Sequence, residues 1–309
     1  MKKKDLLSIF DLSSAEMWAL LKKAAILKNA KKHSAMLAGK SLGLIFEKPS
    51  TRTTVSFAVA MNQLGGFPLI LNPQNLQRRR GESIKDTART LSRYLDSIVI
   101  RAFRHADIEE FATWSSVPVI NGLSDMEHPC QVMGDILTVM EKKKIKTPEE
   151  LRKIKVVFVG DGNNMANTWI GAAAALGFSF TLARPDGYGP SNAMLQKARA
   201  IAKASGATIE ITENPLQAVK NADVIYTDVW TSMGEEAEAE KRRVVFRPYQ
   251  VNSKLIAGAK KGCIVLHCLP AIRGEEITDD VMDSPDSSIF DQAENRLHIQ
   301  KAVLVHLIK

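Results

Sequence analysis

The chain has 309 residues, of which 45% are apolar and 25% are charged, a balance that is typical of folded globular proteins and argues against disorder. At roughly 150 residues per domain, this length suggests about two domains. No apolar run reaches the roughly 18 residues that a membrane-spanning helix needs, and no signal-type apolar core follows the basic start, so we expect a cytoplasmic protein. Three cysteines are too few for a disulfide framework.

The net charge of +8, from 42 basic and 34 acidic residues, fits a nucleic acid, an anionic membrane surface or a small anionic substrate. The basic runs are short, spread along the chain and not interleaved with aromatic residues. Most of them therefore match an ordinary solvated surface. We expect neither a nucleic-acid nor a membrane partner; steeply salt-dependent binding to DNA or RNA would support the nucleic-acid alternative.

The first half of the chain alternates between helical and strand-like patterns. Ser13 and Glu16 form a capping box, and the apolar residues that follow at helical spacing predict a helix to residue 28. Gly65-Gly66 is a stop signal for a second helix that begins near residue 51. We expect strands at 42–46, 67–71, 97–101 and 117–121, and further helices near 84–95, 108–114 and 129–144.

The second half repeats this alternation after Lys146-Thr147-Pro148, which breaks the helical pattern and marks the expected domain boundary. We expect strands at 155–159, 179–183, 208–211, 224–228 and 263–268, and a last helix at 291–308. Apolar strands joined by helical crossovers predict parallel sheets that are covered on both faces. The fold class is therefore α/β, with two doubly wound domains, each a central parallel sheet flanked by helices.

Polar residues that follow strands are the best functional candidates, because open α/β sheets bind ligands beyond the carboxyl ends of their strands. The first such cluster is Ser50, Thr51, Arg52 and Thr53, where a predicted strand leads into a helix. Unpaired amides and the positive dipole end of a helix bind anions, and an arginine fork suits phosphate. Simple N-capping is the alternative, and the glycine pattern of a Walker A loop is absent from the sequence.

Arg101 ends a predicted strand, and alone it fits a ligand contact and a surface strand end equally well. His128-Pro129-Cys130-Gln131 follows the next strand and opens a helix, since proline suits the first helical turn. His128 can donate a hydrogen bond to a carbonyl oxygen, and Gln131 offers both a donor and an acceptor.

The turn Gly160-Asp161-Gly162 resembles the start of a dinucleotide-binding fingerprint, but Met165 stands where the third glycine would be. A nicotinamide-dependent oxidoreductase is therefore a weak rival hypothesis, which a cofactor-binding titration would test. The same turn presents Asn163 and Asn164 at a helix start, where either amide could contact a small ligand.

Two later clusters also follow strands. Asp228 could pair with a cationic amine, and Ser232-Met233-Gly234 leads into an acidic segment with the composition of a mobile loop. In His267-Cys268-Leu269-Pro270, Cys268 could be a nucleophile, a zinc ligand or a packed thiol; four zinc ligands at typical spacing are not evident. Arg296 adds a further arginine to the last helix.

Taken together, these motifs resemble the aspartate/ornithine transcarbamylase family over nearly the whole chain. Ser50-Thr51-Arg52-Thr53 and His128-Pro129-Cys130-Gln131 have the family's order and spacing. Asp228, Ser232-Met233-Gly234 and His267-Cys268-Leu269-Pro270 are similar to its ornithine branch, since aspartate-specific members would be expected to carry H-P-L-P and no S-M-G loop.

The resemblance implies a role for each matching residue. The residues implied to hold carbamoyl phosphate are Ser50, Thr51, Arg52, Thr53, Gln77, Arg101, His128, Gln131, Cys268, Leu269 and Arg296. Those implied to bind ornithine are Asn164, in preference to Asn163, with Asp228, Ser232 and Met233. The implied catalytic residues are Arg52, Arg101, His128 and Cys268.

The resemblance also implies the reaction and the assembly. A carbamoyl group would pass from carbamoyl phosphate to the δ-amino group of ornithine through a tetrahedral intermediate, giving citrulline for arginine biosynthesis, with no cofactor or metal. The alternative amines are an acylated ornithine and putrescine. A carbamoyl-phosphate-binding domain would cover residues 1–146 and an ornithine-binding domain 147–290, and a C-terminal helix at 291–309 would pack back on the first domain.

Members of this family are homotrimers, and the resemblance implies that a loop from the neighbouring subunit enters each active site. This loop commonly reads Q-L-G-R-G-E-S, whereas here it reads Gln77-Arg78-Arg79-Arg80-Gly81-Glu82-Ser83. Gln77 keeps its place, while Arg78 and Arg79 replace a flexible, neutral pair.

Overall fold

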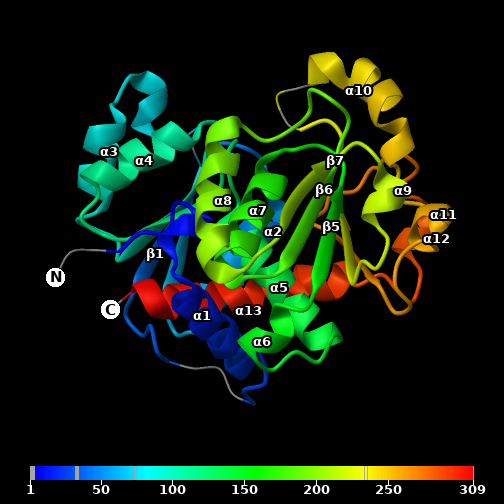
Figure 1. Cartoon of the computed structure of the whole chain (residues 1–309). Helices are drawn as coiled ribbons and strands as arrows, with labels where there is room; N and C mark the ends of the chain where they lie inside the picture. Colours follow the sequence, from blue (N-terminus) through cyan, green and yellow to red (C-terminus); the bar gives the residue numbers. More distant parts are fainter. Residues whose placement is uncertain are drawn as a thin grey trace. The chain divides into compact units, whose positions relative to one another are not determined.

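The computed structural model describes residues 4–31, 35–72, 74, 76–232, 234 and 236–308, with the backbone alone at residues 78 and 79. The chain separates into two compact units (Figure 1). The first comprises residues 1–137 with 294–309, and the second comprises residues 138–293. In the described part of the chain, no helix combines the length and the apolar character that a membrane crossing requires.

The first unit is built on a four-stranded parallel sheet in the order β2-β1-β3-β4. Its strands are β1 (Ser41–Phe46), β2 (Phe67–Leu71), β3 (Ser97–Arg101) and β4 (Val119–Leu123). Its helices are η1 (Ile9–Asp11), α1 (Ser14–Lys28), α2 (Thr51–Gln63), η3 (Gln77–Arg80), α3 (Ile84–Leu91), α4 (His105–Trp114) and the first part of α5 (Pro129–Lys142).

The second unit has a five-stranded parallel sheet in the order β7-β6-β5-β8-β9. Its strands are β5 (Lys155–Val159), β6 (Ser179–Ala183), β7 (Ile209–Thr212), β8 (Val224–Thr227) and β9 (Ile264–His267). Its helices include α6 (Pro148–Leu151), α7 (Asn164–Leu176), α8 (Asn192–Ser205), α9 (Pro215–Ala218), η4 (Glu236–Glu238), α10 (Ala239–Phe246), η5 (Arg247–Tyr249), α11 (Ser253–Ile256) and α12 (Asp279–Met282).

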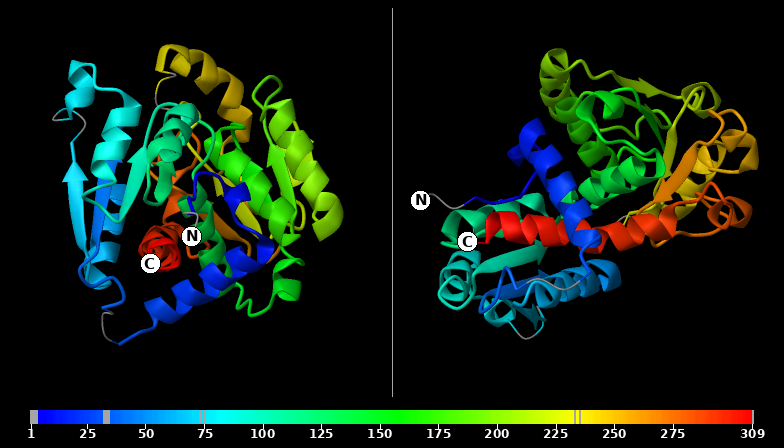
Figure 2. Two further views of the ribbon diagram at one scale, coloured as in Figure 1. Left: turned by 90° about the vertical axis from the view of Figure 1, so that its left-hand side faces the viewer. Right: turned by 90° about the horizontal axis from the view of Figure 1, so that it is seen from below.

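The second sheet is buried on both faces, as apolar parallel strands require. Figures 1 and 2 show α7 and α8 side by side on one face of this sheet. On that face Trp169 of α7 meets the rings of Phe180 and Tyr226, with centroids 6.5 and 5.5 Å away. Alternate strand residues such as Val157 and Val265 point the other way, into a cluster with residues of α9, α11 and α12.

Each strand order reverses direction once, which creates the switch point where ligands bind in such sheets. In the first unit the switch lies between β1 and β3, whose ends meet in register at Phe46 and Arg101. In the second unit it lies between β5 and β8. The motifs of both candidate clusters therefore follow the strands that flank a switch point.

The last helix, α13 (Ile289–Leu307), returns to the first unit from Glu294 onward. It approaches α5 closely at Gly134, where a Cβ atom on the glycine would lie 3.4 Å from Ile299 Cγ2 and 3.5 Å from the Arg296 amide nitrogen. The predicted α/β class, the two doubly wound sheets and the returning helix are thus confirmed.

Most predicted elements are present, and the differences have local causes. The helix predicted from residue 108 starts at His105, because Asp125 Oδ1 accepts the His105 amide at 2.7 Å. The strand predicted from residue 117 starts at Val119, after a proline that has no amide proton to give. The units divide inside α5 and α13, where no proline or glycine break marks the division in the sequence.

Candidate active site

The first candidate cluster lies at the N-terminus of α2, directly after β1. Ser50 is the N-cap residue, and within the described chain its side chain makes no capping hydrogen bond. The Thr53 side chain is buried, while Arg52 is half-buried. The amides of the first helical turn lack intrahelical partners and carry the positive end of the dipole, so this segment suits an anion.

Arg296 of α13 organises the floor of this cluster. Its Nη2 donates to Thr53 Oγ1 at 2.8 Å, and its Nη1 donates to Gln131 Oε1. Gln131 in turn donates through Nε2 to Asp135 Oδ1 at 2.8 Å, and all four side chains are buried. Arg296 therefore brings the returning helix, α2 and α5 together around two of the predicted residues.

His128 is close enough to Arg296 and Arg101 for their charges to affect it. Burial is the main cause that lowers its pKa well below the usual 6.5, and the charges of Arg296 and Arg101 lower this pKa further. The ring is therefore neutral near pH 7, so it can donate one N–H and accept at the other nitrogen. Arg101, buried at the end of β3, is the second cation whose charge acts on this ring.

Gln77 is placed differently from the rest of the predicted carbamoyl-phosphate set. Gln77 is the first residue of η3 and is exposed. Its backbone carbonyl oxygen accepts the Glu82 amide at 3.3 Å. In the described residues, no hydrogen bond joins it to the cluster at α2. The structure thus brings together Thr53, Gln131 and Arg296 by direct contact, and it leaves Gln77 apart.

The second candidate cluster begins at the turn between β5 and α7. Asn163 caps α7, and its Oδ1 accepts the amides of Met165 and Ala166 at 2.9 and 3.2 Å. Its Nδ2 donates to Asp228 Oδ2 at 2.8 Å. The Asn163 side chain is thus committed to the fold, whereas Asn164 is the first residue of the helix.

The glycines of this turn have a packing reason of their own. A side chain at Gly162 would come within 2.7 Å of the backbone of Gly189, and Gly160 has a φ of +140°. Such close approach and such a φ call for glycine whatever ligand binds. The resemblance to a dinucleotide fingerprint therefore needs no nicotinamide cofactor to explain it.

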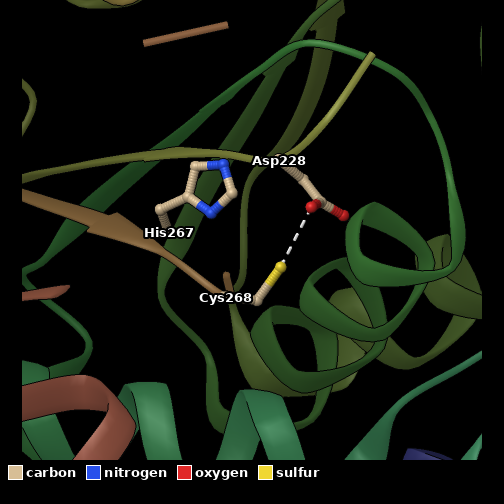
Figure 3. Close-up of side chains that lie close together, drawn as sticks. All are labelled: Asp228, His267 and Cys268. Carbon is tan, nitrogen blue, oxygen red and sulfur yellow. Dashed lines mark hydrogen bonds between the residues drawn. The ribbon is translucent and has the colours of Figure 1, made fainter. Parts of the chain in front are cut away.

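Asp228, just beyond β8, is the centre of the second cluster. Its Oδ1 accepts the Val229 amide at 2.8 Å and the Cys268 thiol at 3.0 Å, and Asn163 binds its other oxygen. Figure 3 shows the Cys268 sulfur directed at this carboxylate. A thiol that donates to a carboxylate holds its proton, which argues against a thiolate nucleophile here.

His267 lies next to Asp228 and Cys268, and their potential ligand atoms are within 4.8 Å of one another (Figure 3). However, both ring nitrogens of His267 are engaged: Leu269 N donates to Nδ1, and Nε2 lies 2.9 Å from Glu276 Oε1. A metal ion could use at most the carboxylate and the thiol without breaking these bonds. The donor set fits a hydrogen-bond network better than a metal centre.

The loop after β8 is tied down by a residue that the sequence patterns did not single out. Arg242 of α10 donates through Nη1 to Asp161 Oδ2 at 2.8 Å and to the Trp230 carbonyl at 3.0 Å. It thereby joins this loop to the turn after β5. Ser232 follows and is half-buried, while Met233 lies outside the described residues.

Asp135 and Glu276 were also missed. Asp135 could have been found, because an acidic residue four positions after Gln131 in an otherwise apolar helix is within hydrogen-bond reach. Glu276 carries no such signal, since a loop separates it from His267 and only the fold brings them together. Arg242 is hidden for the same reason, because its partner Asp161 lies 81 residues away.

Comparisons with known proteins place the chain in a family. The model described as "Aspartate/ornithine carbamoyltransferase, carbamoyl-P binding domain" matches residues 4–141, and that described as "Aspartate/ornithine carbamoyltransferase, Asp/Orn binding domain" matches residues 152–307. The chain belongs to the aspartate/ornithine carbamoyltransferase family, which confirms the resemblance seen in the sequence.

Individual relatives point to one branch. The chain is 52% identical over 311 residues to the ornithine carbamoyltransferase of Pyrococcus abyssi, covering 100% of this chain and 96% of that protein. It is 53% identical to the anabolic ornithine carbamoyltransferase of Pyrococcus furiosus over 97% of this chain and 95% of that one. The solved structure from Pyrococcus furiosus superposes with a TM-score of 0.94 at 52% identity, covering 99% of this chain and 97% of that one.

Proposed function

We propose that this chain transfers the carbamoyl group of carbamoyl phosphate to the δ-amino group of L-ornithine, releasing L-citrulline and phosphate (EC 2.1.3.3). The main structural support for this proposal is the cluster at the start of α2, where Arg296 donates hydrogen bonds to Thr53 and Gln131 and the helix amides suit an anion. Near-full-length relatives named ornithine carbamoyltransferase support ornithine as the amine. One of them is named anabolic, which supports a place in arginine biosynthesis.

In this proposal the phosphate dianion binds at the start of α2. Ser50, Thr51 and Thr53 offer hydroxyl groups, Arg52 offers a planar fork, and the first-turn amides complete the shell. Arg101 adds a cation from the end of β3. These groups also stabilise phosphate as it departs, so they assist the reaction as well as the binding.

The chemical step is a direct attack. The neutral δ-amine forms the C–N bond while the carbonyl electrons move to oxygen, which becomes the oxyanion of a tetrahedral intermediate. Arg101, His128 and Thr53 donate to that oxygen, and Gln131 contacts the carbamoyl end. Collapse then breaks the C–O bond to phosphate, and the proton lost by nitrogen passes to a phosphate oxygen. The step needs no cofactor and no metal ion.

Ornithine binds through the second cluster. Asp228 pairs with the α-amino cation, and Asn164, Ser232 and Met233 contact the amino-acid end. Cys268 lies near the reacting δ-amine, and Leu269 offers its backbone to the carbamoyl group. The commitment of the Asn163 side chain to capping and to Asp228 supports Asn164 as the ornithine contact.

The functional domains follow from these two clusters. The carbamoyl-phosphate-binding domain covers residues 1–146, the ornithine-binding domain covers 147–290, and the C-terminal helix at 291–309 returns Arg296 to the first of them. The descriptions of the two matching family models support this division of labour. The cytoplasmic location stays a prediction.

A homotrimer would bring Gln77 of one subunit into a neighbour's site. The exposed position of Gln77 supports this. So do Val55 of α2 and Phe67 and Ile70 of β2, large apolar side chains that are 55%, 63% and 64% exposed, because a second copy can cover such residues. The molar mass in solution, measured by light scattering, tests this assembly.

The activity is tested by measuring the carbamoylated product formed from carbamoyl phosphate and each of four amines: ornithine, putrescine, N-acetylornithine and aspartate. We expect ornithine to give by far the highest kcat/KM. Equal rates with putrescine would contradict the roles of Asn164 and Ser232, because putrescine lacks the α-carboxylate and keeps only the second amine, with which Asp228 pairs.

A further inference from the structure

His267 closes β9 immediately before Cys268 and Leu269, which the proposed function places against the substrates. Its side chain is fully buried, as is that of its partner Glu276. Neither residue has a role in the reaction as described above. Two polar side chains held at the centre of a fold need a reason, because burying such groups is costly unless their bonds are satisfied.

The hydrogen bonds around His267 define its tautomer. The Leu269 amide donates to Nδ1 at 2.9 Å, so Nδ1 carries no proton. The ring proton is therefore on Nε2, which donates to Glu276 Oε1 at 2.9 Å. The same Glu276 oxygen accepts the Ile272 amide at 2.7 Å, which fixes the carboxylate in turn.

The bond to Leu269 acts at a strained point of the chain. Leu269 has a φ of +59°, in the left-handed region that residues other than glycine rarely adopt. The His267 backbone amide donates to Gln292 Oε1 at 2.9 Å. Backbone and ring of His267 are thus both fixed, and the ring holds Leu269 in a conformation that it would otherwise leave.

We propose that His267, kept in the Nε2–H tautomer by Glu276, is a positioning residue for carbamoyl transfer. It sets the Cys268–Leu269 turn, so that the Leu269 carbonyl and the Cys268 thiol meet the reacting groups. This inference rests on the proposed function, which assigns Cys268 and Leu269 to the substrates. Without the ring acceptor, the Leu269 amide loses its partner and the turn relaxes toward a commoner backbone conformation.

The variants H267A and H267N separate this role from general stability. Alanine removes the acceptor, whereas asparagine can return it, because an Asn side-chain oxygen binds the amide two residues ahead in an Asx turn. We expect H267A to lower kcat about 100-fold, the effect of a displacement of about 1 Å at a reacting group, with KM for both substrates nearly unchanged. H267N should recover kcat to within about tenfold of the wild type.

C263A provides the matched control. Cys263 is a buried thiol just before β9, outside both candidate clusters, so its loss should lower the melting temperature and leave kcat unchanged. Wild-type kcat in H267A, or H267N as slow as H267A, would overturn the proposal.

The tautomer can be read in the wild-type enzyme by ¹⁵N NMR, even if the variants fail to fold. A bare Nδ1 and a protonated Nε2 are expected for His267, and a protonated Nδ1 would refute the positioning role. The NMR result does not depend on turnover. A wild-type enzyme that forms no citrulline would instead refute the proposed function, so the two failures are distinguishable.

Discussion

The two candidate clusters have the same place in their sheets and opposite electrostatic character. Both follow strands that flank a switch point, and both use the start of a helix, α2 in one and α7 in the other. The first gathers donors and cations around a neutral histidine. The second centres on Asp228, a carboxylate that accepts from an amide, an asparagine and a thiol.

The difference teaches how one architecture can select two unlike substrates. At α2 the side chain of the N-cap residue leaves the helix amides to an anion, whereas at α7 Asn163 takes up those amides itself. The amides at the start of α2 are therefore available to an anion, whereas those at the start of α7 already have a hydrogen-bond acceptor in Asn163. Charge at each site is decided by its capping residue and its neighbours, not by the fold class.

The largest effect is expected from R52A. Loss of the guanidinium removes a phosphate contact that strengthens as the leaving group gains charge, so kcat/KM for carbamoyl phosphate should fall about 10³-fold. Arg52 is only half-buried, so the melting temperature should stay close to that of the wild type. R89A, which removes an exposed arginine of α3, is the matched control and should keep full activity. Near-wild-type turnover in R52A would exclude its assigned role.

D228N should affect the other substrate. The substitution keeps the shape and removes the charge that pairs with the α-amino group, so KM for ornithine should rise about 100-fold, the cost of a lost charge-assisted bond in a buried site. Saturation curves for each substrate at a fixed excess of the other measure this. A comparable rise in KM for carbamoyl phosphate would show that the two clusters do not act separately.

Cys268 should have a smaller and graded effect. C268S keeps a donor to Asp228 and should lose only a few-fold in kcat, whereas C268A removes the donor and should lose about tenfold, which corresponds to about 1.4 kcal/mol. Steady-state rates of the two purified variants decide this. Complete loss of activity in both would point to covalent catalysis by the thiol instead.

The last effect concerns stability against pH, not activity. The pKa of His128 is lowered in the folded chain, so below about pH 6.5 the unfolded chain binds a proton that the folded chain does not. Stability should therefore fall as the pH drops from 7 to 5, by at most about 1.4 kcal/mol per pH unit for this group.

Urea unfolding of the wild type and H128Q at pH 7 and pH 5 measures that contribution. The fall should be smaller in H128Q, and it should not vanish, because burial also lowers the pKa of His298. An equal fall in both proteins would mean that His128 is not held neutral by the fold.

The sequence was sufficient for the parts of the site that follow strands. Thr53, Arg101, His128 and Asp228 all occupy the carboxyl-end positions where α/β sheets bind ligands. The approximate places of the strands and the two-sheet organisation were predictable from alternating apolar runs and helix caps such as Ser13, but the strand predicted from residue 117 begins at Val119.

The remainder depends on contacts between residues far apart in the chain. Glu276 fixes His267 across a loop, and Arg242 of α10 binds Asp161, which lies 81 residues earlier in the chain. The division of the units inside α5 is equally invisible, because the helix continues across the division at Leu137 without a proline or glycine there. Periodicity reports neighbours on one element, not partners brought together by folding.

Binding of a non-reactive carbamoyl phosphate mimic, phosphonoacetamide, tests the separation of the two clusters most directly. Isothermal titration without ornithine should give the same Kd for the wild type and D228N, and no measurable binding for R52A under the same conditions. If D228N weakens the mimic as strongly as R52A does, the account of two clusters with opposite charge and separate substrates is wrong.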